Sequence, residues 1–503
     1  MRRRISHGLV VLAALTLSAE LVGSAADPVD PHSWPRQALS EARRIATMVK
    51  DPFRRAQAFE QTAAVTTRLG DRAQACDVLM DALHAAREIA DRSLRDLALR
   101  NIAVNQTRCG DVAGALRTLA EIGDHPLRDA VRTAIVDAQI GSEQLAAALT
   151  IARGIYTPVT MSHALRRIAI ARARQNHFED ARAIAAGIPD GVIRALAFAD
   201  IAALHADVGN TEALEMARSI VRNVRNAAQR DAALGYVAAV QAQSGDVRGA
   251  LSTAATIKGP ATRAHALARI VDARLRVKDT TGAVEELNRA LALARSAKPG
   301  ETTATVLCEI AATFILAGET ERAGIALDAA YSSAVAGRRP RQESAIFQTI
   351  ARTQARAGDF AGALETARKV PTGSAQGLVI HDILASQAEA GDAGAATETA
   401  RSLDDPQLKI AGLIGIVGTQ TASGDVLGVN ESLQLIISVA RTTPDRDFRA
   451  HSLGAVAAAQ VRLGRTGDGW PIFQEALAEA ATLADPYARA LAYVNLSDPF
   501  TQR

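Results

Sequence analysis

The chain has 503 residues, of which 48% are hydrophobic and only 3% aromatic, so its core must be built mainly from small and aliphatic side chains. Lys and Arg total 57 and Asp and Glu 54, and residues 1–26 hold three of the basic residues and one of the acidic ones. The remaining chain is close to neutral, which argues against nucleic acid or an anionic membrane as its general partner.

Residues 1–26 have the pattern of a secretory signal peptide. Three arginines precede an apolar run over residues 8–23, and Ser24, Ala25 and Ala26 supply small residues for cleavage. We predict a cleaved signal peptide over 1–26, a linker over 27–40, and a bacterial protein that is periplasmic or secreted. No later segment approaches the uninterrupted apolar length of a membrane span, so no transmembrane helix is expected after cleavage.

A Gly-Asp pair recurs along the rest of the chain and marks a repeated turn. Glycine commonly ends a helix with positive φ, and a following Asp caps the next helix. Nine of twelve turn positions are Gly, and Glu143, Asn176 and Lys278 are the exceptions. The twelve turn positions are residues 70, 110, 143, 176, 209, 245, 278, 318, 358, 391, 424 and 464.

Apolar residues keep fixed distances from each turn position. An aliphatic residue stands eight residues before it in every repeat but the first, a large apolar residue often stands eleven before it, and Ala commonly follows five after it. Spacings of three and four mark one face of a helix, so each repeat is predicted to be helix A, a tight turn and helix B. The aliphatic row is Ile102, Ile135, Ile168, Ile201, Val237, Ile270, Ile310, Ile350, Ile383, Ile416 and Val456.

The intervals between successive turn positions have three lengths: short, as from 110 to 143, intermediate, as from 209 to 245, and long, as from 278 to 318. They differ by about one or two helical turns, so the longer repeats are predicted to carry a longer helix B. A last helix A near Arg489 is expected to cap the final hairpin, as terminal repeats must. The sequence therefore predicts an all-α, right-handed α-solenoid of about twelve helix-turn-helix repeats over residues 41–503.

The repeat frame resembles the tetratricopeptide repeat. One repeat carries the pattern as Phe347, Ile350, Ala351, the pair Gly358-Asp359, and Ala363. The chain departs from the family in lacking the helix A tyrosine, in rarely having the closing proline, and in having many repeats that are slightly shorter than the family's. The resemblance implies a concave groove, lined by A helices, that binds a peptide or protein segment.

Motifs of enzymes are not found: there is no HExxH, no phosphate-binding Walker loop and no GxSxG. We therefore predict a noncatalytic protein without a cofactor or a metal. Gly412, Gly415 and Gly418 fall inside a helix A with no preceding strand, so they are interpreted as sites of close helix packing rather than a nucleotide loop.

The three cysteines, Cys76, Cys109 and Cys308, cannot form a complete set of disulfides. Cys76 and Cys109 lie one repeat apart, and export would permit a bridge between them. Whether they pair stays open, and the favoured interpretation is that all three are small apolar residues of the core.

Two polar rows accompany the turn. Gln stands four residues before the turn position in seven repeats, where it is expected mainly to bridge neighbouring backbone or helix ends. Arg stands two residues before it in six repeats, where it suits either the end of a helix or the carboxylates and carbonyls of a bound peptide. The candidate partner-binding residues are Arg166, Arg174, Gln348, Arg352 and Arg356.

A third row, fifteen residues before the turn, is basic in eight repeats and often has an acidic neighbour such as Asp96, Asp129 or Asp231. We interpret it mainly as salt bridging between repeats. The row is Arg55, Arg95, Arg128, Arg194, Arg230, Arg263, Lys409 and Arg449.

The leading functional hypothesis is an exported, noncatalytic scaffold that holds a peptide or protein partner in the groove of a helical solenoid. The alternative is an accessory or regulatory subunit of a cell-envelope enzyme, such as a peptidoglycan-processing enzyme. A third possibility is a structural protein that stacks end to end, although the expected terminal cap argues against it. The partner and the oligomeric state do not follow from the sequence.

Overall fold

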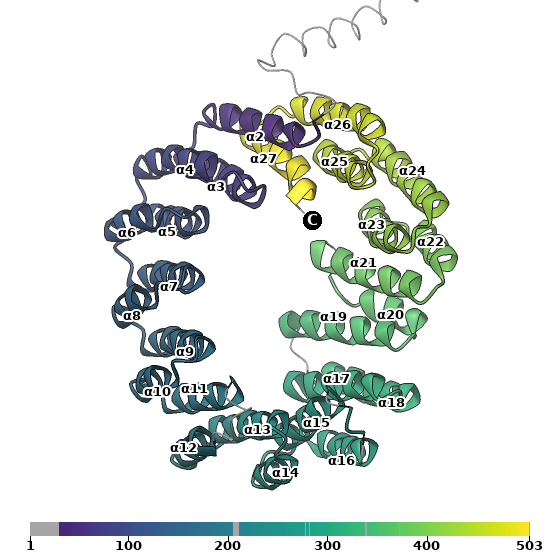
Figure 1. The fold of residues 1–503 in the computed structure, drawn as a ribbon. Coiled ribbons are helices and arrows are strands. Elements are labelled where there is room, and N and C mark those ends of the chain that lie inside the picture. The colour runs from purple at the N-terminus through teal and green to yellow at the C-terminus, as the bar shows by residue number, and fades with distance from the viewer. Residues whose placement is uncertain are drawn as a thin grey trace, which may run out of the picture. The chain divides into compact units, whose positions relative to one another are not determined.

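The computed structural model describes residues 30–501, except residues 205–210, 277, 281, 338–339 and 372. The predicted signal peptide lies outside the described residues. This part of the chain consists of α-helices with one short 3-10 helix, η2 (Asp498–Thr501), and alternates between A and B helices (Figure 1). The A helices are α3 (Pro52–Arg68), α5 (Arg92–Cys109), α7 (His125–Gly141), α9 (Pro158–Arg174), α11 (Gly191–Leu204), α13 (Ala227–Gln243), α15 (Pro260–Arg276), α17 (Glu301–Leu316), α19 (Pro340–Arg356), α21 (Ser374–Glu389), α23 (Pro406–Ser423), α25 (Arg446–Arg462) and α27 (Pro486–Ser497). The B helices are α4 (Arg72–Arg87), α6 (Val112–Glu121), α8 (Leu145–Arg153), α10 (Phe178–Ala186), α12 (Thr211–Arg222), α14 (Val247–Ala255), α16 (Ala283–Ser296), α18 (Thr320–Ala336), α20 (Phe360–Ala367), α22 (Ala393–Ser402), α24 (Val426–Thr442) and α26 (Thr466–Ala481).

The turns have the predicted backbone conformation. Every described turn position has positive φ, including the non-glycine residues Glu143, Asn176 and Lys278 at φ of 61°, 62° and 62°. The Asp that follows caps helix B, as where Asp111 accepts a hydrogen bond of 2.7 Å from the amide of Gly114. One turn position, Gly209, lies outside the described residues. Positive φ is therefore confirmed at the described turn positions, and the Asp cap is confirmed at the Gly-Asp turns.

Replacing Glu143 and Lys278 with glycine is expected to stabilise the protein by about 1 kcal/mol per site, because an L-residue pays a steric cost in the left-handed region that glycine avoids. The midpoint of urea unfolding measures the gain. Glu143→Ala and Lys278→Ala are the matched controls, because alanine keeps the Cβ atom. Equal midpoints for the glycine and alanine variants would contradict the steric explanation.

The lengths of the B helices follow the spacing of the turns. Where the interval to the next turn is short, helix B is short, as in α8 with 9 residues and α20 with 8. Where the interval is long, helix B is longer, as in α18 and α24 with 17 residues each. The prediction that whole helical turns are inserted into helix B is thus confirmed.

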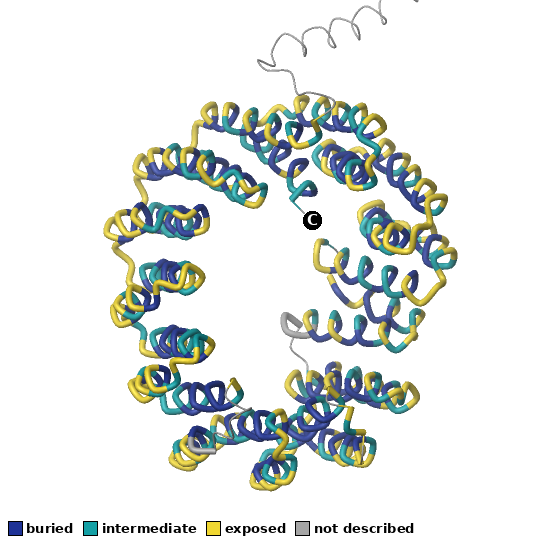
Figure 2. Tube along the Cα trace, viewed as in Figure 1, coloured by how far each residue is buried: buried dark blue, intermediate teal, exposed yellow. Residues whose placement is uncertain are grey.

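The core runs between the A and B helices of each repeat. The predicted aliphatic row and the Ala row five residues after the turn are buried along the array (Figure 2). The glutamine row joins the two helices of one hairpin: Gln241 accepts a hydrogen bond of 2.7 Å from the hydroxyl of Thr253, and Gln420 accepts one of 3.0 Å from Ser432. The structural interpretation of this row is confirmed at these positions, although the partner is a helix B hydroxyl rather than a backbone carbonyl.

Two of the three glycines of α23 lie against α21. A Cβ atom at Gly415 would lie 2.6 Å from the backbone oxygen of His381, and one at Gly412 would lie 2.5 Å from Cδ1 of Leu384. Their predicted role in close helix packing is therefore confirmed. Gly418 does not share it, because a Cβ atom there would meet nothing within 4 Å.

Contacts divide the chain into two compact units, unit 1 (Met1–Leu127 with Leu433–Arg503) and unit 2 (Arg128–Ser432). Unit 2 is a run of hairpins in which the A helices form one row and the B helices another (Figure 1). Unit 1 brings the beginning and the end of the chain together, since α2 (Ser33–Ala46) packs against α27.

The pairing of α2 with α27 reproduces the geometry of a repeat. The helix α27 packs beside the A helices α25 and α3, and α2 occupies the place of a helix B. The buried residues of α2 and of the helix B α4 follow the same pattern at one constant interval: Ala38, Leu39, Ala42 and Ala46 correspond to Val78, Leu79, Ala82 and Ala86. We call the pair of α27 and α2 the composite repeat.

The composite repeat changes two expectations. Residues 33–40 were assigned to a linker, but they belong to α2 because their apolar face is buried in the composite repeat. The predicted final helix is present as α27 and covers the last hairpin, and it also pairs with a helix from the start of the chain.

A disulfide joins Cys76 of α4 to Cys109 at the end of α5, with the two Cα atoms 6.0 Å apart. The favoured interpretation of these residues as unlinked core side chains was therefore wrong. Their separation of one repeat places them on facing helices, a relation that depends on the packing of adjacent hairpins. Cys308 is free and buried, and burial raises the pKa of its thiol to about 12.

Candidate partner-binding face

Each A helix of unit 2 leaves one stripe of side chains uncovered by its B helix. On α15 the stripe consists of His265, Arg269, Asp272 and Arg276, which are half-buried or exposed. The A helices from α9 to α23 contact one another in succession, so their stripes form one continuous surface. We call this surface of α9, α11, α13, α15, α17, α19, α21 and α23 the A-helix face.

Close contacts between polar and charged side chains link neighbouring helices along the A-helix face. His265 of α15 lies 2.9 Å from Glu309 of α17. Arg352 of α19 lies 2.5 Å from Asp382 of α21. Since exposed pairs of this kind contribute at most about 1 kcal/mol each, their main effect is to orient side chains between adjacent repeats.

A larger network spans four consecutive A helices. The Nε atom of Arg166 on α9 donates to Asp200 on α11 at 2.6 Å, and the Tyr236 hydroxyl on α13 donates to the same carboxylate. The guanidinium groups of Arg166 and of Arg269 on α15 lie over the Tyr236 ring, 5.4 and 5.6 Å from its centroid. Cation–π contacts of this geometry are favourable, so the cluster fixes the spacing of four repeats.

The electrostatics of the network keep its groups in their ordinary charge states. Burial opposes the charge on Arg166, but the hydrogen bond to Asp200, the negative charge of that carboxylate and the contact with Tyr236 together outweigh it, so the pKa of Arg166 is raised. Burial and the neighbouring Asp200 carboxylate both raise the pKa of Tyr236, which stays a phenol and a hydrogen-bond donor. The network therefore serves to hold helices and present donors rather than to move protons.

The candidate residues from the sequence fall into two patches of the A-helix face. Arg166 and Arg174 lie on α9, whereas Gln348, Arg352 and Arg356 lie on α19, with α11, α13, α15 and α17 between the two helices. Arg166 and Arg352 are engaged with Asp200 and Asp382. Arg174 and Arg356 are exposed at the carboxyl ends of their helices, and half-buried Gln348 lies 3.5 Å from Ser344 of its own helix.

The arginine row behaves differently in unit 1. Arg68 pairs with Asp498 at 2.6 Å, and Arg462 donates to the backbone oxygen of Pro499 at 3.1 Å. Both bind the last turn of the chain, so these members of the row are structural. Arg174 and Arg356 thus remain the exposed members that stand without an ion-pair partner among the described residues of unit 2.

The residues that sequence reasoning missed are Asp200, Tyr236 and Arg269. They occupy one register, nine residues before the turn positions 209, 245 and 278, and so form a row of their own. Comparing this position across adjacent repeats would have shown an acid, a phenol and a base in succession. Which residues these side chains contact could not be read from the sequence, because it depends on how far each side chain extends toward the next helix.

The third basic row binds the backbone more than it forms salt bridges. Arg95 and Arg194 each donate to a carbonyl six residues earlier, that of Ile89 and Ile188. The members that do pair with an acid find it within their own repeat, as Arg449 of α25 does with Glu479 of α26 at 3.3 Å. The interpretation as salt bridging was therefore wrong for most described members, because the guanidinium group lies nearer the preceding loop.

The acidic neighbours of that row connect successive repeats through the backbone. Asp129 on α7 accepts hydrogen bonds of 2.9 and 2.8 Å from the amides of Tyr156 and Thr157, just before α9. Burial alone would raise the pKa of Asp129, but these bonds and the one from Arg132 outweigh it, so the pKa is lowered. The carboxylate therefore stabilises the fold in its charged form.

Replacing Asp129 with asparagine is expected to destabilise unit 2 by about 1–3 kcal/mol near neutral pH, because a buried, amide-bonded carboxylate is lost. The pKa of Asp129 is lower in the folded chain than in the unfolded one, so this stabilisation is present above the unfolded pKa and is lost as the pH falls through the lowered pKa. Urea midpoints measured from pH 7 to pH 2 check this, with the exposed Asp180→Asn as control. An unchanged acid dependence in Asp129→Asn would contradict the assignment.

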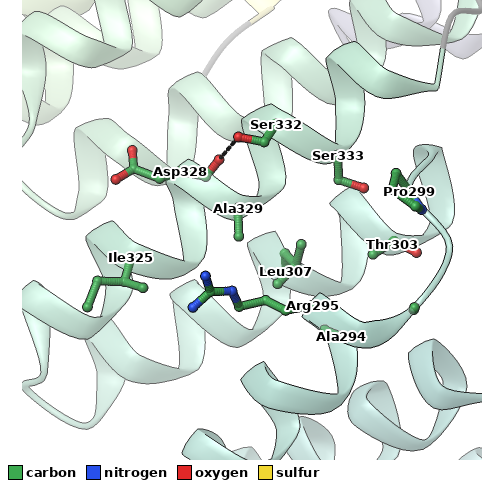
Figure 3. Close-up of a pocket in the computed structure, with 11 residues that line it drawn as sticks. Ala294, Arg295, Pro299, Thr303, Leu307, Ile325, Asp328, Ala329, Ser332 and Ser333 are labelled. Carbon is green, nitrogen blue, oxygen red and sulfur yellow. Dashed lines mark hydrogen bonds between the residues drawn. The ribbon is translucent and has the colours of Figure 1, made fainter.

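A shallow pocket of about 460 Å³ lies away from the A-helix face, among α16, α17 and α18 (Figure 3). Leu307 and Ile325 supply apolar surface, and Arg295 and Asp328 supply one charge of each sign. The mixture of single opposite charges and small side chains specifies no ligand class.

Within the described residues, no cluster of His, Cys, Asp and Glu is suited to holding a metal ion. Across the same part of the chain, none of the helices combines the length and the apolar character needed to cross a membrane.

No protein-family model matches the sequence, and no curated protein matches it. Solved structures with a similar fold include a human IFIT1 dimer with PPP-AAAA, at 15% identity over 83% of this chain and 96% of that chain, with a TM-score of 0.32. Yeast Tom70 matches at 14% identity over 88% and 95%, with a TM-score of 0.27. A signal transduction ATPase with a tetratricopeptide repeat sensor from Pyrococcus horikoshii matches at 13% identity over 80% and 71%, with a TM-score of 0.23. At these values the likeness assigns no function.

The repeated hairpins themselves define the class. Two helices per repeat, a turn residue with positive φ, and a buried small residue early in helix B recur from α3 to α26. The chain is a tetratricopeptide-like helical repeat protein with an all-α solenoid fold.

Proposed function

We propose that this chain is an exported, noncatalytic scaffold that binds a protein or peptide partner on the A-helix face of unit 2. The observation that carries the proposal is the continuity of that face from α9 to α23, where side-chain pairs between helices orient the exposed side chains. A preordered surface of this kind reduces the entropy lost when a partner binds.

The exposed side chains on this face have the chemistry of peptide recognition. Arg174 and Arg356 present guanidinium groups, which suit carboxylates and backbone carbonyls. Between and beside them, Leu316 of α17 and Leu378 of α21 are 56% and 59% exposed. Apolar anchors flanked by arginines are typical of surfaces that bind a protein segment.

Export is proposed from two independent features. The leader over residues 1–26 has the composition of a signal peptide. The Cys76–Cys109 disulfide is of the kind that persists in oxidising compartments such as the bacterial periplasm. Both features support the proposal that the mature chain resides in the periplasm or outside the cell.

Site-specific photo-crosslinking tests the binding face. A photoreactive residue is placed at Thr305 or Thr349, which are exposed on α17 and α19, and at Ile325 or Val335, which are exposed on the B helix α18. The proposal expects one protein partner to be linked from the first pair of positions and not from the second. Equal labelling from both pairs, or labelling from α18 alone, would move binding to the B side.

Charge reversal provides the matched test of the arginines. Arg174→Glu with Arg356→Glu is expected to weaken capture of that partner, because two guanidinium groups become carboxylates on the face. Arg218→Glu with Arg289→Glu changes the same charge on the B helices α12 and α16 and is expected to leave capture unchanged. If the B-helix variant weakens capture and the A-helix variant does not, the assignment of binding to the A-helix face is wrong.

Export is tested by mass spectrometry of the protein made with its leader. The expected mature chain begins at Asp27, and alkylation after denaturation without reductant is expected to label Cys308 alone. The same chain produced in the cytosol without the leader is expected to label all three cysteines when trapped before exposure to air. An unprocessed amino terminus would contradict cleavage after Ala26.

A further inference from the structure

The composite repeat is assembled from helices that no loop connects. Its helix A, α27, ends at Ser497, and its helix B, α2, begins at Ser33. In the other hairpins of unit 1 a short turn joins helix A to helix B. Here the two helices are far apart in the sequence, and no turn joins them. The pairing of α2 with α27 therefore depends on side-chain packing, while the link to α3 and the ion pair of Arg43 with Asp81 of α4 tie α2 to the hairpin that follows it.

The packing surface of α2 is apolar and closely fitted. Trp34 is fully buried, with its ring centroid 5.1 Å from that of Trp470, 5.6 Å from that of Phe473 and 6.2 Å from that of Phe500. Leu39 is buried from the same helix. A polar contact accompanies this packing, since the Ser497 hydroxyl donates to the backbone oxygen of Pro35 at 3.4 Å.

The contacts of α2 show to which part of the fold it belongs. It packs more extensively against α27 than against α3, its neighbour in sequence. Only residues 47–51 separate α2 from α3, with Met48 and Lys50 exposed in that link. Because α2 is held mainly by α27 and is joined to α3 by a short link, α2 can leave its site without unfolding the neighbouring hairpins.

We propose that the composite repeat is an exchangeable joint, in which the surface formed by α26, α27 and η2 accepts α2 from a second copy of this chain in place of its own. The buried contacts are the same whether α2 comes from the same chain or from another, so concentration decides between a closed monomer and a reciprocally exchanged dimer. The second copy is the favoured partner because its α2 carries the same Trp34, Ala38, Leu39 and Ala42 that fill the site.

Complementation between two full-length variants tests the exchange. Leu39→Asp places a charge on the buried face of α2 and leaves α27 intact. Tyr493→Asp disrupts α27 at a buried tyrosine near Glu41 and Arg44 of α2, and leaves α2 intact. Each variant alone is expected to be an open monomer. Refolded together, they are expected to form a heterodimer in which α2 of the Tyr493→Asp chain docks on α27 of the Leu39→Asp chain.

Light scattering during gel filtration measures the mass, and tryptophan fluorescence reports closure, because Trp34 and Trp470 are the only two tryptophans. The heterodimer should restore part of the buried-tryptophan emission that both single variants lose. The control mixture is Leu316→Asp with Tyr493→Asp: Leu316→Asp changes an exposed residue of unit 2 and leaves its own joint closed, so no heterodimer should form.

Two results would overturn the proposal. One is a mixture that stays monomeric although both variants keep their helical circular dichroism. The other is dimerisation of either variant alone to the same extent as the mixture, which would place association on another surface. Should the charged variants lose helicity, the milder pair Leu39→Ala and Tyr493→Ala is used, and absence of heterodimer in that folded pair likewise rejects the exchange.

Discussion

Replacing Trp34 with alanine is expected to lower the stability of unit 1 by about 3–5 kcal/mol, the usual cost of truncating a fully buried large aromatic side chain. Trp34 contacts Trp470, Phe473 and Phe500 in the composite repeat, so the substitution leaves a cavity where the two ends of the chain meet. Amide hydrogen exchange should rise in α2 and α27, the helices that lose their shared core.

The position of the change, as well as its size, tests the composite repeat. Exchange in α9–α23 of unit 2 should stay unchanged, because in a repeat array each hairpin depends chiefly on its neighbours. Trp470→Phe is the matched control, since Trp470 is only half-buried and phenylalanine keeps an aromatic ring. Increased exchange confined to α2, with α27 still protected, would mean that α27 does not depend on the composite repeat.

Loss of the Cys76–Cys109 disulfide is expected to destabilise unit 1 by about 3–4 kcal/mol, the value that chain-entropy arguments give for a closed loop of this size. The bond joins residues 33 positions apart in the sequence and ties helix B of one repeat to helix A of the next. The midpoint of urea unfolding with and without reductant measures the effect. The largest rise in hydrogen exchange is expected in α4 and α5.

The double variant Cys76→Ala, Cys109→Ala is the control for reductant effects elsewhere. Reductant should change the unfolding midpoint of the parent and leave that of the double variant where it is. Cys308 does not complicate the measurement, because burial raises the pKa of its thiol to about 12 and keeps it protonated. If reductant leaves the urea unfolding midpoint of the parent protein unchanged, the disulfide adds no stability.

Local features of the fold were predictable from the sequence because each depends on a few neighbouring residues. Positive φ at Glu143 and Lys278 follows from the repeat register, although neither residue favours that conformation by itself. The long helix B of α18 follows from the long interval to the next turn. In both cases the prediction came from comparing the position with its equivalents in the other repeats.

Features that join distant residues were missed. The apolar residues of α2 do continue the repeat frame, but Asp30 and Pro31 stand where a Gly-Asp turn would have marked it. The pairing of α2 with α27 joins opposite ends of the chain, and no local pattern specifies which of many similar helices will pair. The Cys76–Cys109 disulfide was left open for a related reason: a separation of one repeat permits a bridge, but only the packing of adjacent hairpins brings the two side chains together.

The candidate site was predicted in part: arginines do border the A-helix face, but the sequence did not show which were engaged. Arg166 and Arg167 are neighbours, yet Arg166 pairs forward with Asp200 and Arg167 pairs backward with Asp137. The two neighbouring arginines pair in opposite directions because their side chains point to different sides of the helix. The position of an arginine in the repeat shows which face of the helix it lies on. Which acidic residue it pairs with depends on how neighbouring repeats pack.

The difference between the two rows of helices has a consequence for how such an array can diversify. Most A helices of unit 2 have 16–18 residues, whereas its described B helices that lie wholly within it range from 8 residues in α20 to 17 in α18. Length thus varies mainly among the B helices, and the A helices that form the A-helix face stay more nearly constant in length. Segments can be gained or lost by whole helical turns in the B helices while the A-helix face keeps its period.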